Sequence, residues 1–86
     1  MTKKEMHREI NTKFFMFIEK KFPQYDIDDS EGFGRVYLSH ENGSDSIEYH
    51  LSRHEVCGFN DNSAQSKDDE DIMSTFLEEL VAHYNL

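Results

Sequence analysis

The chain has 86 residues, a formal net charge of −9, and 36% hydrophobic and 13% aromatic residues. This length suits one domain spanning residues 1–86, and the aromatic content argues against intrinsic disorder. A single cysteine excludes an intramolecular disulfide, and no apolar run approaches the roughly 18 residues of a membrane span. We therefore expect a cytoplasmic protein without membrane contact.

The charge is spread unevenly along the chain. Residues 1–21 hold six Lys or Arg and three Glu, a charge of +3, whereas residues 22–86 hold three Lys or Arg and fifteen Asp or Glu, a charge of −12. So acidic a domain repels nucleic acids and anionic membranes and attracts basic surfaces. The expected partner is another protein with a basic surface, with no direct binding of nucleic acid.

An amphipathic helix is predicted over residues 3–22, because apolar side chains recur there every three or four positions. These side chains are Met6, Ile10, Phe14, Phe17, Ile18 and Phe22. Thr2 is a suitable N-cap, and Pro23 ends the helix because proline disfavours the α conformation of the residue before it. Phe15, at the edge of the apolar face, and Met16, outside it, are candidates for exposed apolar contacts.

Apolar and polar residues then alternate, which predicts strands. The predicted strands cover residues of about 24–28, 34–40, 46–53 and 55–59. Asn42-Gly43 favours a tight hairpin turn between the second and third of them. A two-residue loop would pair Leu38 with Ile47 and a four-residue loop would pair Leu38 with Tyr49; both registers keep the apolar residues on one face.

The alternation divides the sheet into two faces. The apolar face is expected to hold Ile27, Val36, Leu38, Ile47, Tyr49 and Leu51. The opposite face, open to solvent or a partner, is expected to hold Arg35, Tyr37, Glu48, His50 and Ser52.

A second helix is predicted over residues 68–85, where large apolar residues again recur at helical spacing. The acidic residues 68–71 are expected in its first turn, where carboxylates interact favourably with free backbone N–H groups. The element order predicts an α+β fold. In this two-layer sandwich, both helices cover one face of a three- to four-stranded antiparallel meander.

No combination of residues indicates an enzyme or a cofactor. Cys57 lies in an acidic stretch, which opposes formation of a nucleophilic thiolate. His50, His54 and Cys57 follow the pattern H-x3-H-x2-C, and His40 could approach across the hairpin. A zinc site needs four convergent ligands, however, and His40 should face away from His50. We expect no metal site, although the spacing leaves open whether His50, His54 and Cys57 converge.

The acidic surface is the remaining candidate site. Its expected contact residues are Asp26, Asp28, Asp29, Glu31, Glu41, Asp45 and Glu48, with Tyr25 and Tyr37 as aromatic anchors. In size, acidity and single-domain character the chain is similar to stoichiometric inhibitors, such as immunity proteins of toxin nucleases and phage anti-defence proteins.

The acidic surface predicts a stoichiometric inhibitor that masks the basic surface of a nuclease or other nucleic-acid-handling protein, and the likeness agrees with this; the chain is expected to be a monomer or homodimer. The likeness rests on general character and on no motif, so it assigns no functional residue. The alternative function is an adaptor or homo-oligomeric subunit that uses an apolar helix or sheet surface. A metal-binding regulator is less favoured.

Overall fold

The computed structural model describes residues 1–29, 34–41, 46–58 and 64–85. It begins with helix α1 (Lys3–Lys21), which confirms the first predicted helix. The Thr2 side chain accepts a hydrogen bond from the backbone N–H of Glu5, as the N-cap prediction requires. Phe22 closes the last turn through its N–H to the carbonyl of Ile18, directly before Pro23.

Four strands follow as an antiparallel sheet in the order β1-β2-β3-β4, which confirms the meander. They are β1 (Tyr25–Asp28), β2 (Arg35–His40), β3 (Ser46–His50) and β4 (Glu55–Gly58). Leu38 pairs with Ile47, the register expected for the two-residue loop. The Asn42-Gly43 turn itself lies outside the described residues.

The third strand is shorter than the predicted 46–53. Residues 51–54 form a turn closed by a 2.8 Å hydrogen bond from the N–H of His54 to the carbonyl of His50. His54 has φ 54°, a left-handed conformation that few residues other than glycine adopt. The turn reverses the chain into β4, so Leu51 leaves the sheet although it continues the apolar alternation.

Helix α2 (Ala64–Tyr84) starts four residues before the predicted position. Consequently no acidic residue lies in its first turn, and the prediction for residues 68–71 was wrong. Residues 64–67 read Ala-Gln-Ser-Lys and contain no large apolar side chain, so periodicity could not reveal them. Alanine, glutamine and lysine nevertheless have good intrinsic helix propensity, which accounts for the longer helix.

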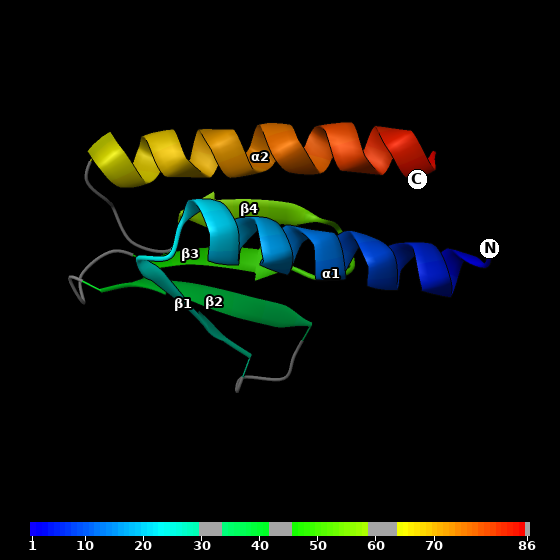
Figure 1. Ribbon diagram of the computed structural model, residues 1–86, viewed down its shortest axis with the longest axis horizontal. Helices are drawn as coiled ribbons and strands as arrows, with labels where there is room; N and C mark the ends of the chain where they lie inside the picture. The colour runs from blue at the N-terminus through cyan, green and yellow to red at the C-terminus, as the bar shows by residue number, and fades with distance from the viewer. Residues whose placement is uncertain (30–33, 42–45, 59–63, 86) are drawn as a thin grey trace.

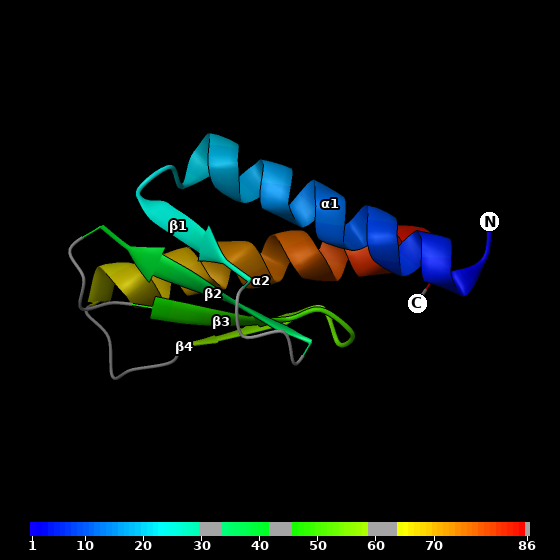
Figure 2. The same cartoon turned by 90° about the horizontal axis from the view of Figure 1, so that it is seen from below.

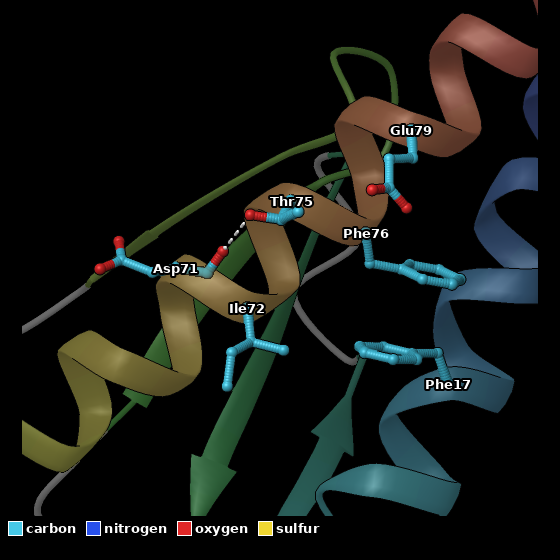
Figure 3. Close-up of a pocket in the computed structure, with 6 residues that line it drawn as sticks. All are labelled: Phe17, Asp71, Ile72, Thr75, Phe76 and Glu79. Atoms are coloured by element: carbon cyan, nitrogen blue, oxygen red, sulfur yellow. Dashed lines mark hydrogen bonds between the residues drawn. The ribbon is translucent and has the colours of Figure 1, made fainter.

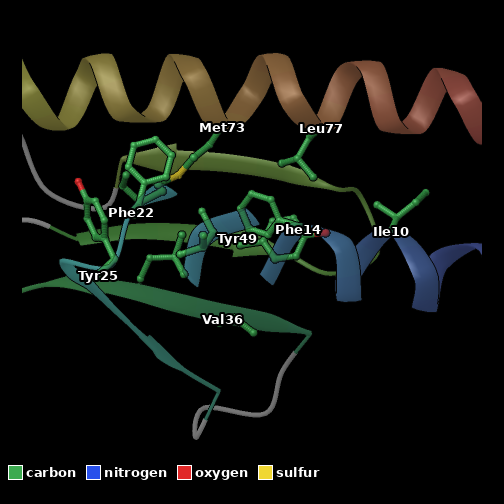
Figure 4. Packing of buried hydrophobic residues seen from close by; sticks show 11 residues of the cluster. Ile10, Phe14, Phe22, Tyr25, Val36, Tyr49, Met73 and Leu77 are labelled. Atoms are coloured by element: carbon green, nitrogen blue, oxygen red, sulfur yellow. The ribbon is translucent and has the colours of Figure 1, made fainter. Parts of the chain in front are cut away.

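Both helices lie over the apolar face of the sheet and run antiparallel, with the two chain ends at the same end of the molecule (Figures 1 and 2). The shared core is drawn in Figure 4. Its buried members are Ile10, Phe14, Ile18, Phe22, Tyr25, Val36, Leu38, Ile47, Tyr49, Met73 and Leu77. The core therefore joins both helices to three strands, as a two-layer sandwich requires. Judged on the described residues, neither helix combines the length and apolarity needed to cross a membrane.

Candidate functional site

The sheet face turned away from the helices carries four of the seven predicted contact residues that the structure describes. The strand registers align Asp28, Tyr37, Glu48 and Cys57 in one row across all four strands. Asp28 and Cys57 are exposed at the two ends of this row, and Tyr37 and Glu48 are half-buried between them. We call this surface the free sheet face.

Negative charge dominates the strands of the free sheet face. Asp26, Asp28, Glu48 and Glu55 lie on it, opposed by Arg35. The Arg35 Nη1 atom lies 3.4 Å from the Glu48 Oε1 atom, and the Arg35 side chain is half exposed. This partly solvated ion pair involves one of the four carboxylates and contributes little stability.

Three predicted contact residues lie off this face or away from its centre. Tyr25 is only 5% exposed and donates a hydrogen bond to the buried Asp69 carboxylate at 3.0 Å, so the prediction that it is an anchor was wrong. It alternates with Asp26 and therefore points into the core. Asp29 and Glu41 are exposed beyond the ends of β1 and β2. The remaining two residues, Glu31 and Asp45, lie outside the described residues.

A second surface feature is an apolar groove between the two helices (Figure 3). The rings of Phe17 and Phe76 stack with their centroids 4.0 Å apart and line the groove together with Ile72, which is 51% exposed. Asp71 and Glu79 line the groove on the α2 side. The groove is open to solvent and has a volume of about 400 Å³. Sequence reasoning missed it because it requires the placement of α1 against α2.

A buried polar chain links α1 to the sheet beneath the helices. Tyr49 donates its hydroxyl hydrogen to the Asn11 side-chain oxygen, so its oxygen accepts from His54 Nδ1 at 3.0 Å. His54 Nε2 is then left to accept from His7 Nδ1 at 2.6 Å. Burial, and next the neighbouring His7, lower the pKa of His54, which favours this neutral form. The arrangement stabilises the packing of α1 against the turn that follows β3.

The three residues of the pattern H-x3-H-x2-C separate in the structure. His54 points toward the helices, whereas His50 and Cys57 meet Glu48 on the free sheet face. One potential ligand atom from each of Glu48, His50 and Cys57 lies within 4.8 Å of the others. The pleat also places His40, whose ring contacts Tyr25, on the face opposite to His50, as expected.

The fold and the free sheet face define a small α+β domain with an acidic, partly aromatic surface. Comparison of the chain with protein-family models, curated proteins and solved structures found no significant match.

Proposed function

We propose that this chain is an acidic protein-binding module that acts as a stoichiometric inhibitor. Its free sheet face docks on, and masks, the basic surface of a nuclease or other nucleic-acid-handling protein. The observation that supports this function is the position of Tyr37 in a row between Asp28 and Glu48, with Asp26 alongside.

Charge and shape act together in such a surface. The carboxylates attract a cationic surface over a distance and align the two proteins, whereas an aromatic anchor supplies binding energy after contact. Tyr37 is half-buried, so its ring is held by the sheet while part of it stays accessible. The hydrogen-bonded register of β1, β2 and β3 fixes the backbone positions of these residues before binding, which limits the entropy lost in the complex.

The test begins with capture of a partner from the native host by the tagged chain. The purified partner must bind nucleic acid, and the chain must compete with that nucleic acid in a one-to-one complex. Affinity should weaken between about 50 and about 300 mM salt because surface charges are screened. An affinity that does not change with salt contradicts the proposal.

A matched pair of double variants locates the surface. Asp26→Asn with Asp28→Asn removes two charges from the free sheet face, and Glu19→Gln with Glu78→Gln removes two exposed charges from the helices. We expect the first pair to weaken binding at least about tenfold, or about 1.4 kcal/mol. Equal losses in both pairs would show that net charge, and not this face, determines affinity.

The groove between α1 and α2 supports a second candidate, a homo-oligomeric subunit or adaptor. Ile72 beside the stacked Phe17 and Phe76 is an exposed apolar surface of the kind that marks protein contacts. Sedimentation at micromolar concentration should then show a dimer that Ile72→Glu dissociates. This candidate function is excluded if the wild-type chain is a monomer and captures no partner protein through the groove.

A further inference from the structure

Three side chains of different chemistry converge at the β3–β4 side of the free sheet face. Glu48 and His50 are two residues apart on β3 and so project to the same side, and Cys57 on β4 pairs directly with Glu48. The side chains of His50 and Glu48 are only 10% and 14% exposed, so neighbouring atoms restrict them. Cys57 is exposed and leaves the cluster open to solvent on its side.

We propose that Glu48, His50 and Cys57 bind one Zn²⁺ ion, with water in the fourth position. Zinc in proteins takes carboxylate oxygen, imidazole nitrogen and thiolate sulfur at about 2.0–2.3 Å. Calcium and magnesium require oxygen ligands, so this mixed set selects against them. The inference concerns the isolated chain and does not depend on the proposed docking function.

The geometry requires only small side-chain movements. Two ligands of one tetrahedral zinc ion are about 3.6 Å apart at these bond lengths, compared with the present limit of 4.8 Å. The Nε2 atom of His50 already lies 3.2 Å from the Oε2 atom of Glu48. Rotation of the exposed Cys57 side chain would bring its sulfur to the same ion as Glu48 and His50. The backbone need not move, because β3 and β4 are already held in register.

Two arginines compete with the metal for these ligands. Arg53 Nη2 lies 2.9 Å from His50 Nδ1, and because arginine only donates, Nδ1 is the acceptor and Nε2 carries the ring hydrogen. When zinc binds Nε2, that hydrogen moves to Nδ1 and the exposed Arg53 withdraws. The Cys57 thiol loses its proton to solvent, so one proton is released per ion. Arg35 forms an ion pair with Glu48 and therefore competes with the metal for that carboxylate.

The direct experiment titrates chelator-treated protein with Zn²⁺ against a chromophoric competitor, and with Co²⁺ as a spectroscopic probe. We expect one ion per chain and a thiolate-to-cobalt charge-transfer band. Cys57→Ser should abolish the band and weaken zinc binding at least about tenfold, the loss typical of disturbed metal sites. His50→Gln and Glu48→Gln should weaken binding similarly, whereas Arg53→Gln should tighten it by removing the competitor.

His83→Gln is the matched control, because His83 is exposed in the last turn of α2. Far-UV circular dichroism checks that each variant remains folded, and the exposed Cys57 is the substitution least able to disturb the fold. Absence of stoichiometric binding, or wild-type affinity in Cys57→Ser, overturns the zinc site. An equal loss in His83→Gln also overturns it, because binding would then be spread over surface histidines. These metal-binding experiments do not test partner capture. A negative result therefore overturns the zinc site without deciding the docking function.

Discussion

Tyr49 shows how a single polar atom is accommodated in the core. The residue is fully buried, its ring packs against Phe14 at 4.2 Å between centroids, and burial raises the pKa of its hydroxyl. Its hydroxyl joins Asn11 on α1 to His54 after β3. One atom thereby connects β3 and the turn that follows it to α1, which is distant from both in the sequence.

Replacing Tyr49 with Phe should lower the free energy of unfolding by about 1–3 kcal/mol, because Asn11 and His54 each lose a buried partner. Urea denaturation measures the change. Tyr84→Phe is the matched control: its hydroxyl accepts a hydrogen bond from Lys13 at the surface, so we expect a change within about 0.5 kcal/mol. A Tyr49→Phe protein as stable as the control would show that the buried chain contributes no stability.

The pH dependence of stability should report on His54. Its pKa is lowered in the folded protein, so the unfolded chain binds more protons between the folded value and the unfolded value of about 6.5. The stability contributed by neutral His54 is therefore complete above about pH 6.5 and is lost as the pH falls toward the folded pKa. His7 faces the ring from α1, and Glu55 and Glu78 line the depression beside it.

The measurement compares wild type with His54→Asn, because asparagine tolerates the left-handed backbone of this position. Between about pH 7.5 and about pH 5.5, the free energy of unfolding should fall more steeply in wild type than in the variant. Parallel profiles would assign the pH dependence to other groups.

At the scale of elements, α2 presents two kinds of apolar residue. Leu77 is buried against the sheet and α1, whereas Ile72 faces the groove and is half exposed. Leu77→Ala should therefore cost about 2–5 kcal/mol through lost burial and a cavity. Ile72→Ala should change stability by no more than about 0.5 kcal/mol. Thermal and urea unfolding of the two variants test this, and equal losses would contradict the packing of α2.

The order and type of all six elements follow from the sequence, because apolar periodicity changes from helical to alternating and back. The predicted ends of these elements were wrong where apolar periodicity was absent or continued beyond the element. Residues 64–67 lack large apolar side chains, and Leu51 continues an alternation that the turn at His54 interrupts. Asn42-Gly43 narrowed the register of β2 and β3 to two choices, and the structure pairs Leu38 with Ile47.

The candidate site was predictable only in part. Alternation alone placed Tyr37 and Glu48 together on one face. The approach of Cys57 to Glu48 depends on the register of β3 and β4, which is set by a turn without a recognisable sequence signature. Tyr25 was expected as an anchor because of its acidic neighbours, although the same alternation turns it toward the core.

At the scale of the whole molecule, the charge distribution opposes folding. Residues 22–86 carry −12, and in the described part of the chain ion pairs join Arg35 to Glu48, and Lys67 to Glu70 and Asp71. The molecule measures 39 × 25 × 21 Å, so at about 0.01 M salt, where the Debye length is about 30 Å, most carboxylates repel one another across it. Near physiological salt that length falls to about 8 Å, and the repulsion becomes local.

Stability should therefore increase as sodium chloride is raised from about 10 to about 300 mM, because screening relieves repulsion in the compact state. Urea unfolding at each concentration measures the increase, and choline chloride should act equally if screening is the cause. Asp26→Asn with Asp28→Asn reduces the net charge by two and should shrink the salt dependence. A free energy of unfolding that stays constant or decreases with salt would mean that local pairing already neutralises the carboxylates. The free sheet face would then lack the long-range field that docking on a basic partner requires.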